Sequence, residues 1–163
     1  MTALTHRPAI GIIVVNERGQ VLVARRNDME NQWQFPQGGI DSNETPQEAV
    51  FRELLEETGI NQNSVEILGN TEKYLKYDYP PMVMQELNRS KTWRYDGQQV
   101  QFFLIRYFGS DEAIDVQNVP KPEFDAWKWV DYWEPLNLIV EFKRDMYDRA
   151  LTELVQNLPF EVK

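Results

Sequence analysis

Short apolar runs of strand length follow one another along most of this chain. They are rich in Val, Ile and aromatic residues, which favour strands, and they cover residues 9–15, 20–25, 33–36, 65–68, 74–77, 100–108 and 127–130. The turn-forming segment Asn16–Gly19 separates the first two runs and predicts that they form a β-hairpin. These runs are therefore expected to form a sheet.

Two segments have the periodicity of helices instead. In the first, Thr45 is a good N-cap, Pro46 suits the first helical position, and Glu48 completes a capping box. Gly59 can take the left-handed conformation that ends a helix. The apolar side of this helix is expected to face the core through Val50, Phe51, Leu54 and Leu55. The second predicted helix covers residues 138–158.

Strands and helices together predict a mixed α/β fold. A chain of 163 residues is long enough to bury a core, and a single domain over residues 1–163 is expected. Residues 78–97 form a long polar stretch that contains aromatic residues and Pro80-Pro81. A connection of this length usually carries function or is disordered.

Composition and charge exclude several classes of function. The chain has no cysteine, which rules out disulfides, thiolate metal sites and cysteine nucleophiles, and its single histidine argues against a zinc site or a Ser-His-Asp triad. No segment has the pattern of a signal peptide or a membrane span, so a cytoplasmic protein without a membrane partner is expected. The net charge of −9 argues against DNA as a partner, but not against one RNA end or a short polyphosphate.

Acidic residues gather on the first predicted helix. Glu53, Glu56 and Glu57 have i, i+3 and i+4 spacing and share one face. Each like-charged pair costs roughly 0.2–0.5 kcal/mol even when exposed, and a hard cation such as Mg²⁺, which prefers oxygen ligands, would remove that repulsion. Arg52 lies four residues before Glu56 and could orient its carboxylate. A solvated acidic face is the alternative reading of this helix.

The segment from Gly38 to Ile60, GGIDSNETPQEAVFRELLEETGI, resembles the signature of the Nudix hydrolases. It follows G-x5-E-x7-R-E-L-x-E-E-x-G-I over 23 residues without a departure, and a solvated acidic face would require none of these fixed distances. The resemblance implies the Nudix fold, an α/β/α sandwich with a mixed central sheet and a catalytic loop–helix–loop. It also implies hydrolysis of a phosphoric anhydride bond with Mg²⁺ or Mn²⁺, as two or three ions bound together with the substrate.

Longer segments are similar to one branch of that family. RPAIGIIVVNERGQVLVARR, WQFPQGGI, PEFDAWKWVDYWEP and EFKRDMY resemble the bacterial RNA pyrophosphohydrolases, which remove pyrophosphate from triphosphorylated RNA 5′ ends. YDYPP at 77–81 looks more like the related diadenosine tetraphosphate hydrolases, which give ATP and AMP. The expected partner is the 5′ end of RNA, with a dinucleoside polyphosphate as the alternative. A Nudix-fold binding module without turnover is a third hypothesis, against which the intact carboxylate set argues.

The resemblance also implies roles for individual residues. The expected metal ligands are the Gly38 carbonyl and the carboxylates of Glu53, Glu56, Glu57 and Glu123. These carboxylates and Arg52 form the expected catalytic set. Glu56, Glu57 or Glu123 would accept the proton of the water that attacks phosphorus. Glu44 is expected to stabilise the loop rather than to bind metal.

The candidates for substrate binding are basic or aromatic, namely Arg7, Arg25, Arg26, Tyr77, Phe142 and Lys143. Arg25 and Arg26 are adjacent after a strand and point to opposite faces, so one is expected to reach phosphate and the other to form a surface salt bridge. Phe142 resembles the aromatic on which this branch stacks a base, with core packing as the alternative. For Arg7 and Lys143 the alternative is simple surface charge.

One feature departs from both substrate branches. A basic residue and a tryptophan tend to follow the Gly-Gln that opens the central strand, whereas Gly97-Gln98 continues here as Gln99-Val100-Gln101. One expected phosphate contact is therefore missing, and the candidates to replace it are Arg89, Lys91 and Arg94. The sequence leaves the oligomeric state open.

Overall fold

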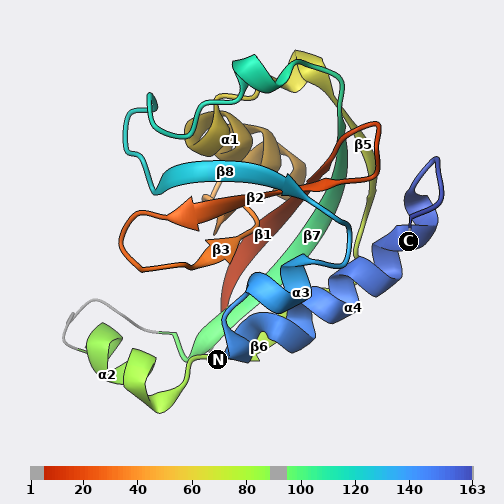
Figure 1. Ribbon diagram of the computed structural model, residues 1–163. Coiled ribbons are helices and arrows are strands. Elements are labelled where there is room, and N and C mark those ends of the chain that lie inside the picture. The colour runs from red at the N-terminus through yellow and green to blue at the C-terminus, as the bar shows by residue number, and fades with distance from the viewer. Residues whose placement is uncertain (1–5, 89–94, 163) are drawn as a thin grey trace.

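The computed structural model describes residues 6–88 and 95–162. Its strands are β1 (His6–Val15), β2 (Val21–Arg26), β3 (Trp33–Gln34), β4 (Gln37–Gly39), β5 (Val65–Asn70), β6 (Leu75–Asp78), β7 (Gly97–Tyr107) and β8 (Phe124–Val130). Its α-helices are α1 (Pro46–Thr58), α2 (Pro81–Asn88), α3 (Pro135–Leu138) and α4 (Arg144–Leu154), joined in places by short 3₁₀ turns at Gln62–Ser64, Asp111–Ala113, Glu141–Lys143 and Val155–Asn157 (Figure 1).

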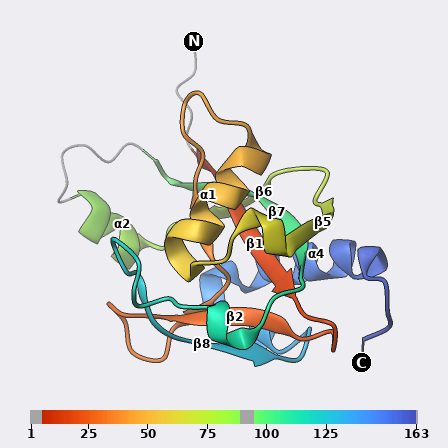
Figure 2. The ribbon, with the colours of Figure 1, turned by 90° about the horizontal axis from the view of Figure 1, so that it is seen from above.

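The strands form one mixed sheet of eight, in the order β3-β2-β1-β7-β5. In addition, β4 pairs with β1, β6 with β7, and β8 with β2, which lies beside it in Figure 2. Only the β1–β7 pair is parallel among the pairings described, and it runs from His6↔Gly97 to Val15↔Arg106. This register places the first residues of β1 beside the first residues of β7, which is where the pocket described below lies.

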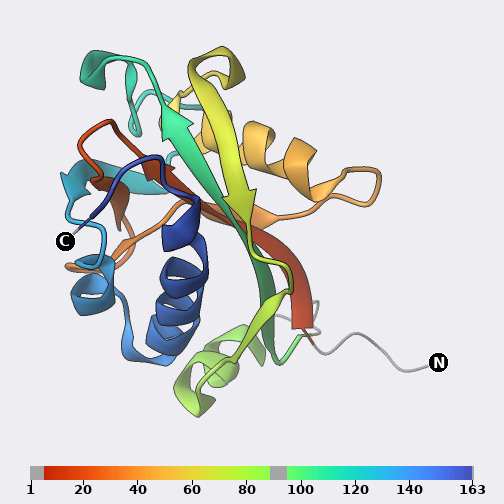
Figure 3. The same cartoon turned by 90° about the vertical axis from the view of Figure 1, so that its right-hand side faces the viewer.

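Each face of the sheet carries a separate core. Ile12 packs in the cluster beneath α1, and its neighbour Ile13 packs in the cluster beneath α4, because successive strand residues point to opposite faces. Figure 3 shows α1 and α4 on opposite sides of the sheet. On the α4 side, Phe35 stacks on Tyr147 with ring centroids 4.6 Å apart. The predicted α/β/α sandwich with a mixed sheet is confirmed.

The caps of α1 are those predicted, but its buried face is predicted only in part, by Val50 and Leu54. Thr45 Oγ1 accepts from the Glu48 N–H, Glu48 accepts in return from the Thr45 N–H, and Gly59 has φ 74°. Leu55, expected in the core, is 50% exposed and Phe51 is half-buried. The buried residues of this helix include Leu54, as expected, and also Glu57. The helix is rotated so that a carboxylate enters the interior where a leucine was expected.

One predicted helix has the wrong extent, and an α-helix forms where none was predicted. Residues 138–158 do not form one helix, because Ile139 has extended dihedrals (φ −77°, ψ 148°) and separates α3 from the 3₁₀ turn and α4. The stretch 78–97, for which no helix was predicted, contains α2, whose first turn has a hydrogen bond from the Met84 N–H to the Pro80 carbonyl. Arg89, Lys91 and Arg94 lie outside the described residues.

The rotation of α1 predicts very different costs for two neighbouring leucines. Leu54→Ala is expected to lower the free energy of unfolding by about 2–5 kcal/mol, since it leaves a cavity in the core. Leu55→Ala is expected to change it by less than about 1 kcal/mol, since half of that side chain is already in solvent. Urea unfolding followed by circular dichroism measures both, and equal losses would contradict the described face.

Candidate functional site

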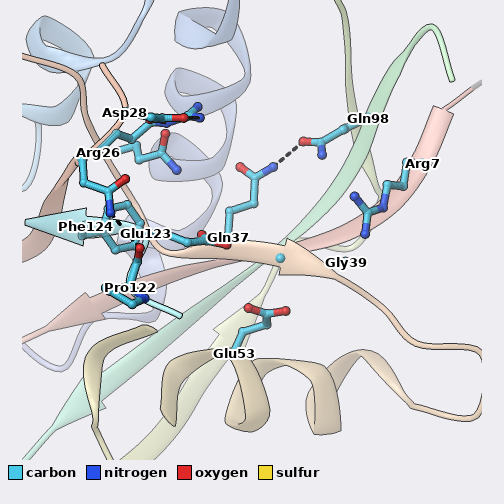
Figure 4. Close-up of a pocket in the computed structure, with 13 residues that line it drawn as sticks. Arg7, Arg26, Asp28, Gln37, Gly39, Glu53, Gln98, Pro122, Glu123 and Phe124 are labelled. Atoms are coloured by element: carbon cyan, nitrogen blue, oxygen red, sulfur yellow. Dashed lines mark hydrogen bonds and ion pairs between the residues drawn. The ribbon is translucent and has the colours of Figure 1, made fainter. Parts of the chain in front are cut away.

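A cavity of about 490 Å³ opens along the free edge of β4 (Figure 4). Among the described strands β4 pairs only with β1, so its other edge is not covered by a strand. The lining comes from β1, β2, β4, α1, β7 and the segment that leads into β8, and it includes Arg7, Arg26, Gln37, Gly38, Gly39, Glu53, Gln98 and Glu123. Residues distant in the sequence are thus gathered around one short strand.

The two glycines of β4 allow charged side chains to approach its backbone. A Cβ at Gly38 would collide with the carboxylate of Glu53, and a Cβ at Gly39 would collide with the guanidinium of Arg7. Because adjacent strand residues point to opposite faces, the carboxylate and the guanidinium approach β4 from opposite sides, as Figure 4 shows. Glycine is therefore required at both positions for close approach.

Arg52 connects α1 to the loop that precedes it. Its Nε and Nη2 donate to the two carboxylate oxygens of Glu44 at 2.7 and 2.9 Å, and Nη2 also donates to the Gly39 carbonyl at 2.9 Å. Its Nη1 donates to Glu53 at 2.8 Å and to Glu56 at 3.3 Å. The hydrogen bonds from Arg52 lower the pKa of Glu44. Glu44 therefore holds the loop, as the sequence predicts.

The main electrostatic feature of the site is the buried carboxylate of Glu57. Glu57 is 5% exposed, and its Oε2 is buried without a hydrogen-bond partner. Burial raises the pKa of Glu57 well above its usual value, and the nearby charges of Glu123 and Glu53 raise it further. Burial also raises the pKa of Glu53, although its hydrogen bond to Arg52 opposes the shift. An unpartnered buried oxygen is costly, and a cation beside it would remove that cost.

These residues fit a hard divalent cation in part. Oxygen donors of the kind that Mg²⁺ prefers are present on Glu53 and Glu57, and Glu123 is close enough to share a hydrogen bond with Glu57. The carboxylate of Glu56 is more than half exposed and directed to Arg52. Across residues 6–88 and 95–162 no three acidic or histidine side chains are gathered tightly enough to hold an ion alone. Phosphate and water would have to supply further ligands, as is usual for Mg²⁺.

The two adjacent arginines at the end of β2 have separate environments. Arg26 lines the cavity and forms an ion pair with Asp28 at 2.7 Å. Arg25 does not line the cavity; it pairs with Asp125 at 2.7 Å and lies over the ring of Trp33. The expected division places Arg26 on the phosphate side, and a phosphate contact by Arg26 stays a prediction.

Tyr77, Phe142 and Lys143 form a second cluster outside the cavity lining. The rings of Tyr77 and Phe142 have centroids 5.7 Å apart, and Lys143 Nζ lies 5.4 Å from the centre of the Tyr77 ring. Phe142 is half-buried and packs against the α4-side core, so the alternative of core packing holds at least in part. Lys143 is 8% exposed, so it is no simple surface charge. Burial and the charge of Arg26 lower its pKa to about 8.

Two cavity residues were given no role from the sequence. Gln37 and Gln98 lie in the wall between Arg7 and the acidic residues, and their side-chain amides are hydrogen-bonded to each other. Both adjoin a glycine, Gln37 before Gly38 and Gln98 after Gly97. Polar residues beside glycines that permit close backbone approach were the available signal.

Residues 5–150 match the NUDIX domain. The chain belongs to the NUDIX family. The resemblance of its Gly38–Ile60 segment to the Nudix signature is thereby confirmed, and the protein is a hydrolase of phosphoric anhydride bonds. Nudix hydrolases generally use divalent metals such as Mg²⁺, which agrees with the donor set around Glu57.

Curated relatives of this Nudix hydrolase match it along nearly its whole length. The RNA pyrophosphohydrolase of Marinomonas sp. is 47% identical over 150 residues, which cover 92% of this chain and 91% of the relative. The RNA pyrophosphohydrolase of Stutzerimonas stutzeri is 46% identical over 153 residues, with 94% of each chain covered. In the described part of the chain, no helix is both long and apolar enough to cross a membrane.

Solved Nudix structures share the fold. The dihydroneopterin triphosphate pyrophosphohydrolase of E. coli has a TM-score of 0.71 at 17% identity, with 93% of this chain and 99% of that chain covered. An Ap4A hydrolase of C. elegans has a TM-score of 0.63 at 15% identity, with 92% and 99% covered. At these identities the likeness shows the fold alone.

The environment of Lys143 predicts a pH-dependent stability. Its folded pKa of about 8 lies below its ordinary value of 10.5, so between these values the unfolded chain binds more protons and stability rises with pH. One pKa unit corresponds to about 1.4 kcal/mol, so wild type should gain about 2 kcal/mol relative to Lys143→Met between roughly pH 7.5 and roughly pH 9.5. Urea unfolding at both pH values measures the difference. A constant difference would mean that the amine is solvated.

Proposed function

We propose that this Nudix hydrolase removes pyrophosphate from the triphosphorylated 5′ end of RNA. The observation that carries the proposal is the cavity beside β4, which is lined by Arg7 and Arg26 and by the carboxylates of Glu53 and Glu123. The buried carboxylate of Glu57 lies close to both of these carboxylates. A polyphosphate needs cationic contacts at its oxygens, and a metal-dependent hydrolase needs carboxylates at the phosphorus that reacts. The relatives named RNA pyrophosphohydrolase support RNA as the substrate.

The proposed ligands for two or three divalent ions are the Gly38 carbonyl and the carboxylates of Glu53, Glu56, Glu57 and Glu123. Bound ions would neutralise the polyphosphate and lower the pKa of an attacking water. Glu56 has to turn away from Arg52 to take part. Arg52 would then keep Glu53 in place, since it holds that carboxylate at 2.8 Å.

The reaction needs a proton acceptor and a bound phosphate chain. Glu56, Glu57 or Glu123 accepts the proton of water as its oxygen attacks phosphorus, and the bond to the departing phosphate oxygen breaks in line. Burial raises the pKa of Glu57, which makes its carboxylate a stronger proton acceptor. Arg7 and Arg26 bind the phosphate oxygens, and Phe142, Tyr77 and Lys143 hold the first nucleotide.

A second substrate class is favoured by one feature of the fold. Tyr79 packs edge-to-face on Tyr77 at 5.7 Å, which extends the aromatic cluster that contains Phe142. A wider aromatic surface suits a second base, because each stacked base contributes about 1–3 kcal/mol. The alternative is therefore asymmetric hydrolysis of a dinucleoside polyphosphate such as diadenosine tetraphosphate.

The substrate proposal predicts the outcome of one competition. With Mg²⁺ and equal concentrations, kcat/KM for triphosphorylated RNA is expected to exceed that for diadenosine tetraphosphate by about tenfold or more, a difference of about 1.4 kcal/mol in transition-state binding. Release of pyrophosphate and of ATP measures the two reactions. A higher value for the dinucleotide would establish the alternative, and no turnover of either would favour a binding module.

The metal and proton roles predict the effect of two conservative changes. Glu53→Gln and Glu57→Gln are each expected to lower kcat by about 100-fold or more, since each removes a charge from the reacting centre. The thermal midpoint of Glu57→Gln should not fall, because burial disfavours the charged form of the carboxyl group that is removed. Glu66→Gln, on the exposed face of β5, is the matched control and should keep normal turnover. Near-normal kcat in either site variant would remove that residue from the proposed set.

A further inference from the structure

Gln98 lies in the cavity wall at the start of β7. The parallel register pairs it with Arg7 of β1, so the amide and the guanidinium line the same cavity from neighbouring strands. Figure 4 shows the Gln98 side chain between those of Gln37 and Arg7. Any phosphate held by Arg7 would therefore lie beside this amide.

The carbonyl oxygen of Gln98 is already occupied. It accepts one hydrogen bond from Gln37 Nε2 and a second from the Tyr77 hydroxyl at 2.5 Å. A carbonyl oxygen has two lone pairs, so its capacity is filled. The amide nitrogen consequently points away from Gln37, toward the open cavity (Figure 4). No described residue accepts a hydrogen bond from Gln98 Nε2, which leaves two N–H donors for a ligand.

The other two side-chain amides of this strand donate to backbone carbonyls instead. Gln99 Nε2 donates to the His6 carbonyl at 3.1 Å, and Gln101 Nε2 donates to the Thr71 carbonyl at 3.1 Å. Neither residue lines the cavity. Of the three glutamine side chains on β7, only that of Gln98 lines the cavity.

Hydrogen bonds from Tyr77 and Gln37 orient the side-chain amide of Gln98. Tyr77 is 8% exposed, and its ring packs against Tyr79 and Phe142, so its hydroxyl has little freedom. Gln37 belongs to β4 and directly precedes Gly38, so its backbone is held by the sheet. A donor that is already oriented contributes more to binding than one that must be ordered by the ligand.

We propose that Gln98 Nε2 binds a phosphate oxygen of the substrate beside Arg7. The proposal rests on the proposed function, since it names a specificity residue of the same cavity. The contact is neutral, so it selects for the position of an acceptor oxygen rather than for negative charge alone. Tyr77 and Gln37 are positioning residues in this scheme, because they act through the Gln98 carbonyl.

A purely structural role for Gln98 is the alternative to be tested. In that case its carbonyl would only satisfy Gln37 and Tyr77, and any acceptor of the same size would serve. Gln98→Glu separates the two roles, because a carboxylate still accepts from both neighbours but offers an oxygen to the cavity instead of N–H donors. Gln99→Glu adds the same charge on the opposite face of β7 and is the matched control.

The steady-state prediction is a change in KM at nearly constant kcat. For triphosphorylated RNA, Gln98→Glu is expected to raise KM by about tenfold or more, since hydrogen bonds to charged groups are among the stronger ones, while kcat stays within about threefold. Because the new carboxylate could also pair with Arg7, Gln98→Met repeats the test without added charge, and a rise in KM of about tenfold is again expected. Tyr77→Phe keeps the ring, frees the amide to rotate, and should give a smaller rise.

Binding of methylenediphosphonate, a non-hydrolysable pyrophosphate analogue, is measured in parallel by calorimetry with Mg²⁺. The dissociation constant should rise by about tenfold in both Gln98 variants and stay within about twofold of wild type in Gln99→Glu. Unchanged KM and unchanged analogue binding in Gln98→Glu and Gln98→Met would overturn the phosphate contact. If wild type turned over neither RNA nor the dinucleotide, the proposed function would fail, and the calorimetric comparison would still decide the role of Gln98.

Discussion

One guanidinium holds the acidic site in a defined arrangement. Arg52 donates to the carboxylates of Glu44, Glu53 and Glu56 and also to the Gly39 carbonyl, so it links α1, the preceding loop and β4. Without it, Glu53 and Glu56 would repel each other on neighbouring turns of the helix, and the loop would have no fixed attachment to β4. The geometry of the cavity therefore depends on a residue that does not line it.

Signals from neighbouring residues in the sequence were sufficient to predict where α1 begins and ends. The ends of α1 follow from Thr45, Glu48 and Gly59, because caps and left-handed stops act through adjacent backbone groups. The spacing of the acidic residues likewise predicted their common helix. The rotation of α1 was not predictable in the same way, since apolar side chains normally define the buried face. Here Glu57 is buried while Leu55 is half exposed, so apolar side chains alone do not define the buried face of this helix.

Features that depend on the pairing of distant strands could not be obtained from the sequence. The proximity of Arg7 to Gln98 follows from the parallel register of β1 and β7, and no local pattern encodes that register. The break at Ile139 and the presence of α2 similarly reflect how the chain packs back onto the sheet. Resemblance identified most charged candidates, whereas the neutral amides Gln37 and Gln98 carried no charge to mark them, although both lie in segments that resemble the family.

The two adjacent glycines of β4 allow opposite charges to approach the two faces of this strand. Side chains of opposite charge, Glu53 and Arg7, are separated by little more than the thickness of one extended backbone. A ligand at the open edge of that strand lies in a steep electric field, so only a molecule with a negative end and a cation-bound end gains on both sides. A phosphate chain carrying its counter-ion is therefore favoured in one orientation, with its free oxygens toward Arg7 and its cation toward Glu53.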